Sequence, residues 1–101
     1  MTINKKLDGS QLAVEIEGRL DTTTAPSLEL ELNENSDLSA VETLIFDFEK
    51  LEYVSSAGLR VLLATQKAMK SHGSMIIKNV NDSIMEVFEI TGFADILTIE
   101  K

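Results

Sequence analysis

Residues 43–48 constrain the fold more than any other part of this sequence. In an extended chain, Leu44, Phe46 and Phe48 lie on one side and Ile45 lies on the other. A strand that is apolar on both sides is typical of the centre of a sheet, where helices cover the two faces. We therefore expect a central strand here, with neither of its faces left in water.

A helix is predicted to follow this strand and to end at Gly73. Its apolar residues recur at helical spacing and are Leu59, Leu62, Leu63 and Met69. Arg60, Lys67 and Lys70 supply a polar stripe, and Gly73 offers a stop in the left-handed conformation. Ser55 and Ser56 stand where the helix begins, and its first backbone N–H groups need an oxygen acceptor or an anion.

Composition limits the classes of function that this chain can have. The 101 residues are enough for one domain with its own core, and the sequence has no cysteine, which excludes disulfides and thiolate ligands. The net charge of −8, from 17 acidic and 9 basic residues, argues against binding nucleic acid or an anionic membrane. Because no apolar run reaches signal-peptide or membrane-spanning length, we expect a cytoplasmic protein without direct membrane insertion.

The residues before the central strand predict a hairpin and a helix. Residues 3–6 and 12–17 alternate around the turn pair Asp8-Gly9, which indicates two antiparallel strands toward one edge of the sheet. A helix is then expected from Ala25 to about Asn33, with Thr24 as its capping residue and Pro26 in its first turn. A polar break at residues 35–37 separates it from the central strand.

The residues after Gly73 predict two short strands around a third helix. Residues 74–78 form the first strand, with apolar side chains on both faces. Residues 83–86 fit a capping box, and the helix that they open is expected to bury Ile84, Val87 and Phe88 and to stop at Gly92. Residues 96–99 form the last strand.

The predicted order of elements is therefore β-β-α-β-α-β-α-β. Strands that alternate with helices pair in parallel through right-handed crossovers, and the opening hairpin adds an antiparallel edge. We predict an α/β fold with one mixed sheet packed by helices, in a single domain over residues 1–101.

Catalytic and metal-binding functions find little support in these residues. A serine at a strand-to-helix turn suggests a nucleophile elbow, but that motif needs glycines on both sides and a partner histidine. The single histidine, His72, is at the other end of the predicted helix, roughly 20 Å away at 1.5 Å per residue. Asp47, Glu49 and Glu52 show no fixed pair spacing. We expect no catalytic residue, no metal site and no cofactor.

The serines at residues 55 and 56 leave two interpretations open. A serine at a helix start is most simply a capping residue worth about 1 kcal/mol. The turn also lies at the carboxyl end of a strand, where open α/β sheets place their binding sites. Gly58 is compatible with close contact between helix and sheet, whatever the serines do.

Two motifs in this sequence resemble those of the STAS-domain family, in particular the bacterial anti-sigma factor antagonists. The family's central motif is an apolar residue followed by Asp-Ser-Ser/Thr-Gly-Leu, and residues 54–59 read Val-Ser-Ser-Ala-Gly-Leu. The second motif is Gly-x-Leu-Asp before a helix start that contains threonine, and residues 18–24 read Gly-Arg-Leu-Asp-Thr-Thr-Thr. The resemblance extends over essentially the whole chain and implies a STAS fold.

The resemblance implies a switch that works by phosphorylation. In the family, an anti-sigma factor that is also a serine kinase phosphorylates the serine before the Ser/Thr-Gly-Leu positions, which corresponds to Ser56 here. The unphosphorylated antagonist sequesters the kinase and thereby releases sigma factor. Phosphorylation breaks this complex, and a phosphatase restores it. This sequence departs from the motif at Ser55, where the family has an acidic residue, and at Ala57, where it has a hydroxyl. Ser55 is therefore the alternative acceptor.

The resemblance also suggests a docking face and a second function. Both motifs precede helices at strand ends, so the partner-binding residues are expected to be Asp21, Thr22, Ser55, Ser56 and Gly58. Other family members are subunits of bacterial lipid-transport ABC complexes, in which the same face would bind an ATPase as a structural or regulatory module.

Overall fold

The computed structural model describes residues 1–34 and 36–100, which form the predicted mixed α/β fold with three α-helices and with six strands, one more than predicted. The strands are β1 (Thr2–Asp8), β2 (Gln11–Leu20), β3 (Thr43–Asp47), β4 (Leu51–Val54), β5 (Ser74–Lys78) and β6 (Thr98–Glu100). The helices are α1 (Ala25–Asn33), α2 (Ser56–Lys70) and α3 (Asp82–Thr91), with 3-10 turns at Leu38–Ala40 and Phe93–Asp95.

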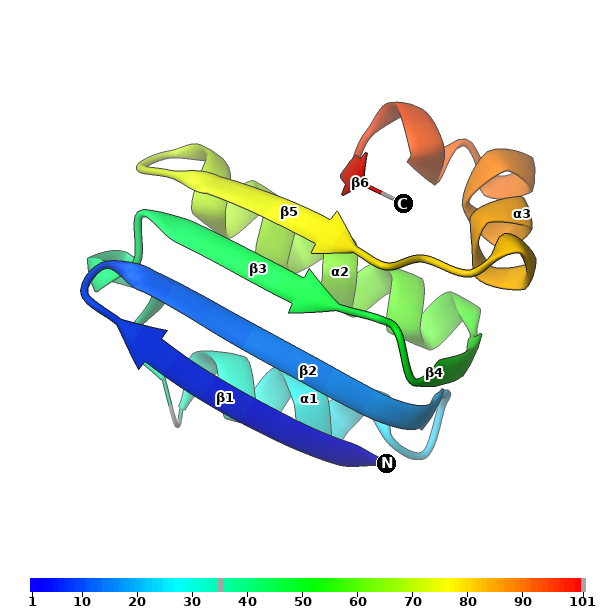
Figure 1. Ribbon diagram of the computed structural model, residues 1–101, viewed down its shortest axis with the longest axis horizontal. Coiled ribbons are helices and arrows are strands. Elements are labelled where there is room, and N and C mark those ends of the chain that lie inside the picture. The colour runs from blue at the N-terminus through cyan, green and yellow to red at the C-terminus, as the bar shows by residue number, and fades with distance from the viewer. Residues whose placement is uncertain (35, 101) are drawn as a thin grey trace.

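The sheet has the strand order β1-β2-β3-β5-β6, with β4 beside the end of β2 (Figure 1). The hairpin pair β1 and β2 is antiparallel, and the other pairs are parallel. The predicted order lacks β4, because residues 51–54 were assigned to the connection between strand and helix. The sixth strand forms because β2, with ten residues, is long enough to pair with two strands along one edge. Residues 11–15 of β2 pair with β3, and residues 18–20 extend beyond it and pair with β4.

Helices α1 and α2 cover one face of the sheet (Figure 1). The predicted inward residues of α1 are buried, as are Leu59, Leu62 and Met69 of α2, whereas Leu63 is only half-buried. They pack on strand side chains of the same face that are also buried, among them Val14, Ile16, Leu44, Phe46, Met75 and Ile77. Burying each such side chain stabilises the fold by about 1.5–3 kcal/mol.

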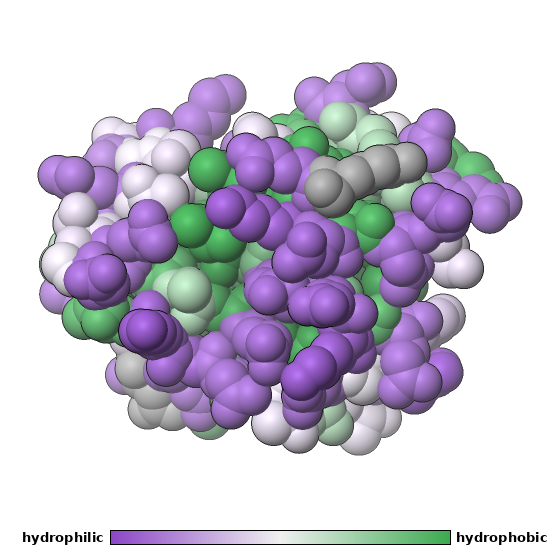
Figure 2. Space-filling model, viewed as in Figure 1, coloured by the Kyte–Doolittle hydropathy of each residue, from purple (hydrophilic) through white to green (hydrophobic). Residues whose placement is uncertain are grey.

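The opposite face of the sheet contradicts the prediction that neither face is left in water. Figure 1 shows no helix in front of β2, β3 or β5, and Figure 2 shows apolar side chains between polar ones on this face. Ala13, Ile45 and Ile76 lie side by side in register and are each half-buried. Cross-strand neighbours shield one another from water, so this apolar strip does not need a helix over it.

Two of the three helix starts are capped differently from the prediction: α1 has the predicted capping residue without its capping bond, and α3 has another capping residue. Thr24 is at the start of α1 as expected, but its hydroxyl bonds to backbone groups of Asp21 and Arg19 and makes no capping bond. Helix α3 starts at Asp82, and its cap is Asn81, whose side chain accepts a hydrogen bond from the backbone N–H of Ile84 at 2.9 Å. The capping box predicted at residues 83–86 is therefore wrong.

Gly73 does not have the left-handed conformation that the sequence suggested. Its backbone is not among those with positive φ, whereas Gly92 ends α3 in that conformation with a φ of 82°, as predicted. A Cβ at residue 73 would collide with the backbone carbonyl of Glu42. Gly73 is thus required by the close approach of two chain segments.

Candidate functional site

The two sequence motifs meet at the carboxyl ends of β2 and β4. Leu20, the last residue of β2, is in register with Val54, the last residue of β4. The backbone N–H of Ser55 donates to the carbonyl of Leu20 at 2.9 Å, which ties the two strand ends together. The loop at Asp21 that leads into α1 and the turn at Ser55 that leads into α2 are therefore neighbours.

Ser55 and Ser56 have different roles at the start of α2. Ser55 is the N-cap residue, with extended backbone, and its half-buried side chain accepts a hydrogen bond from the backbone N–H of Gly58 at 3.4 Å. Ser56 is the first residue of the helix, and its side chain is exposed. Within the described part of the chain, the Ser56 hydroxyl makes no hydrogen bond. Ser56 is therefore accessible at the positive end of the helix.

Asp21 organises the loop beside these serines. Its carboxylate accepts hydrogen bonds from the backbone N–H groups of Thr23 at 3.0 Å and Thr24 at 3.1 Å. The bond from Thr24 is the main reason why the pKa of Asp21 lies below its ordinary value of 3.8. Asp21 thus shapes the loop, while Thr22 at the loop's tip is exposed.

Gly58 lies beneath this surface. It is buried, and a Cβ at this position would lie 2.7 Å from Cγ of Leu20 and 3.0 Å from Cγ2 of Val54. The glycine lets α2 approach β2 and β4 closely, as the sequence suggested. Any effect of Gly58 on a partner would act through the position of the helix.

An exposed pair of side chains that the sequence analysis did not identify lies on the same two strands. The guanidinium of Arg19 is 4.3 Å from the centre of the Tyr53 ring, and Tyr53 is 41% exposed. Arg19 also contacts the Asp21 carboxylate, with 3.7 Å between Nε and Oδ2. The pair exists because β4 places Tyr53 in register with Arg19, and the prediction lacked β4. The alternation of residues 51–54 is too short to have revealed it.

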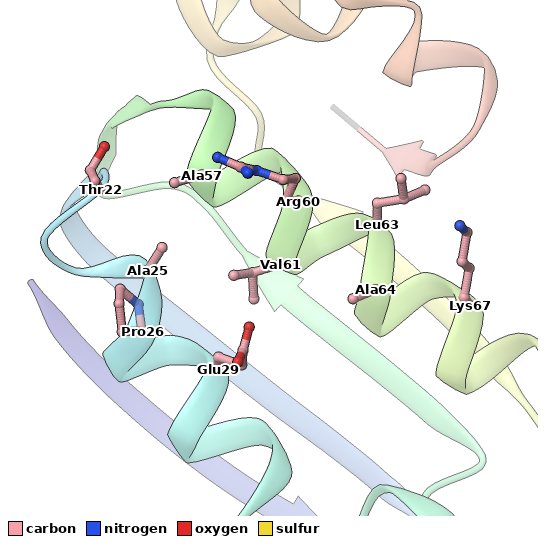
Figure 3. A pocket seen from close by; sticks show the side chains of 10 residues that line it. All are labelled: Thr22, Ala25, Pro26, Glu29, Ala57, Arg60, Val61, Leu63, Ala64 and Lys67. Atoms are coloured by element: carbon pink, nitrogen blue, oxygen red, sulfur yellow. The ribbon is translucent and has the colours of Figure 1, made fainter.

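A groove of about 560 Å³ lies between α1 and α2, and its lining includes Thr22 and Ala57, the residue after Ser56 (Figure 3). Most of its lining is apolar, with one acidic and two basic side chains. The lining residues are Thr22, Ala25, Pro26, Glu29, Ala57, Arg60, Val61, Leu63, Ala64 and Lys67.

The described residues contain neither a cluster of metal-ligating side chains nor a membrane-spanning helix. In residues 1–34 and 36–100, no three His, Asp or Glu side chains are grouped so that they could hold a metal ion. Over the same residues, no helix is both long enough and apolar enough to cross a membrane.

Comparison with known proteins identifies the family. The sequence model of the STAS domain matches residues 2–101. The chain belongs to the STAS domain family. The resemblance of the two motifs to this family is thereby confirmed.

Curated relatives of this STAS domain have names that refer to anti-sigma factors. BtrV of Bordetella bronchiseptica, provisionally named an anti-sigma factor antagonist, is 34% identical over 95 residues, which cover 93% of this chain and 80% of the relative. The anti-sigma-B factor antagonist of Bacillus subtilis is 29% identical over 100 residues, which cover 98% of this chain and 90% of the relative.

Solved structures agree with the fold of this STAS domain. The anti-sigma factor antagonist SpoIIAA in its unphosphorylated form has a TM-score of 0.77 at 19% identity, and the match covers 99% of this chain and 88% of SpoIIAA. The phosphorylated form of SpoIIAA, from Bacillus, has a TM-score of 0.75 at 19% identity, covering 99% and 92%. At this level of identity the similarity shows the STAS fold alone.

Proposed function

We propose that this STAS domain is an anti-sigma factor antagonist whose binding is switched by phosphorylation of Ser56. In its unphosphorylated form it binds an anti-sigma factor that is also a serine kinase, in the cytoplasm, and thereby frees a sigma factor. The names of the curated relatives support this class of function. The observation that carries the proposal is the exposed Ser56 side chain at the first residue of α2.

The proposed reaction is transfer of a phosphoryl group from ATP to the Ser56 oxygen. That oxygen forms a bond to the γ-phosphorus, the bond to the β-phosphate oxygen breaks, and ADP leaves. The hydroxyl proton passes to a base of the kinase. A phosphatase then hydrolyses the phosphate ester with water and regenerates the free serine.

The start of α2 is suited to accept this phosphate without a change of fold. A phosphate adds about −1.5 to −2 charge, and a helix N-terminus stabilises such a charge by about 0.3–1 kcal/mol. The capping bond from the backbone N–H of Gly58 goes to Ser55, so modification of Ser56 leaves it in place. The cost therefore falls on the partner, whose docked surface would have to bury a hydrated dianion.

The proposed docking face comprises Asp21, Thr22, Ser55 and Ser56, with Gly58 acting from below through the position of α2. The exposed Arg19 and Tyr53 border it, and arginine and tyrosine are enriched at the energetic centres of interfaces. In the complex, the kinase would cover Ser56 and hold its hydroxyl at the ATP site.

The test is to incubate the pure protein with the anti-sigma factor kinase of its organism and ATP, and to map the modified residue by mass spectrometry. We expect one phosphate on Ser56, none on Ser56→Ala, and an unchanged yield on Ser55→Ala. Adding the phosphatase should remove the phosphate. Phosphorylation of Ser56→Ala would make Ser55 the acceptor. Stable binding to an ATPase without any phosphate transfer would favour the lipid-transport function.

A further inference from the structure

The groove between α1 and α2 is continuous with the proposed docking face. Thr22 and Ala57 line its near end, and Ala57 follows Ser56 in the chain (Figure 3). Further along, Val61 and Ala64 of α2 line it across from Pro26 and Glu29 of α1. A partner that covers Ser56 therefore also lies next to the near end of this groove.

Two cations, Arg60 and Lys67, lie on the α2 side of this groove, beside the apolar Val61 and Ala64, and Figure 3 shows their side chains pointing away from α1. Arg60 and Lys67 are both exposed and are seven residues apart, so they lie on the same side of the helix. Neither makes an ion pair within the described residues, whereas Lys5, Arg19, Lys50 and Lys78 all pair with carboxylates. Lys6 and Lys70 also make no ion pair in the described residues, but of these four cations only Arg60 and Lys67 line the groove, in a chain with a net charge of −8.

We infer that this groove receives an acidic amphipathic helix of the anti-sigma factor, with carboxylates of that helix against Arg60 and Lys67. This inference rests on the proposed function. A groove between two helices fits the apolar face of a third helix. At 1.5 Å per residue, Arg60 and Lys67 are about 10.5 Å apart along α2, so acidic residues two turns apart on the partner match both. Glu29 on the opposite wall directs the acidic side of the partner helix toward α2.

Phosphorylation would weaken this contact directly. Ser56 and Arg60 are four residues apart on one helix, so the phosphate and the guanidinium are neighbours on its surface. A phosphate on Ser56 would draw Arg60 away from the partner's carboxylate. A phosphate on Ser56 would therefore lower the affinity of the groove for the partner helix, although Ser56 does not line the groove.

Calorimetric titration with the same anti-sigma factor kinase tests the inference through four variants. Arg60→Gln and Lys67→Gln should each weaken binding roughly two- to fivefold, which is the range of a partly exposed ion pair. Lys70→Gln is the matched control, because Lys70 is exposed on the same helix and does not line the groove. It should leave the affinity unchanged, although it alters the net charge equally. Glu29→Gln should strengthen binding.

The outcomes separate this inference from the proposed function. Failure of the wild-type protein to bind the kinase would overturn the proposed function. If Arg60→Gln and Lys67→Gln leave the affinity unchanged, the inference about the groove is wrong and the proposed function still stands. The same holds if Lys70→Gln weakens binding as much as they do.

A second measurement needs no kinase. A 14-residue helical peptide with leucine on one face and glutamate on the other should shift the amide NMR signals of Val61 and Ala64, and its lysine counterpart should not. Equal shifts with both peptides, or a dimer of this chain that buries the groove, would contradict the inference.

Discussion

Ser55 and Ser56 are adjacent residues whose hydroxyl groups have different surroundings. Ser55 is half-buried and accepts the capping bond of α2, and Ser56 is exposed and makes no hydrogen bond within residues 1–34 and 36–100. The structural role of Ser55 and the signalling role that we propose for Ser56 therefore belong to two adjacent residues.

The first prediction separates these two roles by mutation. Ser55→Ala should lower stability by about 0.5–1 kcal/mol, the lower part of the range for a lost cap, because its bond is long at 3.4 Å. This corresponds to a fall in Tm of a few degrees. Ser56→Ala should leave Tm unchanged. Thermal melts followed by circular dichroism measure both, and a larger loss for Ser56→Ala would contradict the assignment of Ser55 as the cap.

The second prediction concerns Asp21 and acid. Because backbone N–H groups, chiefly that of Thr24, hold the pKa of Asp21 below 3.8, its stabilisation is present above that pH and is lost as the pH falls through the folded-state pKa. Asp21→Asn should therefore melt below wild type at pH 7, and the difference in Tm should shrink below pH 3.8. A constant difference across this range would contradict the account of Asp21.

At the scale of elements, the position of α2 depends on its close contact with β2 and β4. Gly58 makes that contact possible, and the side chains that meet there belong to the last residues of the two strands. The proposed docking face and the groove both depend on this junction for their geometry.

The third prediction tests the junction with Gly58→Ala. At an exposed helix position alanine is more favourable than glycine by about 1 kcal/mol, but here the added Cβ would lie 2.7 Å from buried Leu20. Overpacking of this kind costs about 1–3 kcal/mol, so Tm should fall. Ala68→Gly, at an exposed position on the same helix, should cost about 1 kcal/mol and measures the difference in helix propensity between alanine and glycine in α2. An increase in Tm for Gly58→Ala would contradict the close contact.

Local signals in the sequence predicted some elements well and others not at all. Helix α1 has the predicted bounds, because Pro26 and the polar break after Asn33 act locally. Strand β4 was missed because it forms by pairing with the part of β2 that extends beyond β3, and this pairing cannot be read from residues 51–54 alone. The capping of α3 by Asn81 depends on a tertiary hydrogen bond, which the side-chain nitrogen of Asn81 donates to the carbonyl of Leu51 at 3.0 Å.

The candidate site divides in the same way. The location of both serines at a helix start follows from the periodicity of residues 59–69 and was predicted. The pairing of Arg19 with Tyr53 requires the register of β4, and the groove requires the packing of α1 on α2, which no short motif encodes.

For the whole molecule, phosphorylation of Ser56 has to act as a switch that leaves the fold in place. The sheet and its core lie beneath the start of α2, and the Ser56 side chain points out of them into solvent. A negative group at this position interacts favourably with the helix and unfavourably with an approaching partner.

The fourth prediction uses a charge in place of the phosphate. Ser56→Asp should melt within a few degrees of wild type, because a carboxylate at the first turn of a helix is favourable by a few tenths of a kcal/mol. It should bind the anti-sigma factor more weakly than Ser56→Ala does. Circular dichroism melts and calorimetric titration provide the two values, and a Ser56→Asp protein that unfolds would exclude a rigid switch.

The central claim is that a phosphate on Ser56 changes what a partner binds while the domain keeps its structure. The most direct measurement is the Kd of one anti-sigma factor for the unphosphorylated and the enzymatically phosphorylated protein, with the Tm of each recorded in the same buffer. We predict at least a tenfold weaker affinity after phosphorylation, about 1.4 kcal/mol, with an unchanged or slightly higher Tm. Equal affinities, or a loss of binding accompanied by unfolding, would contradict the account.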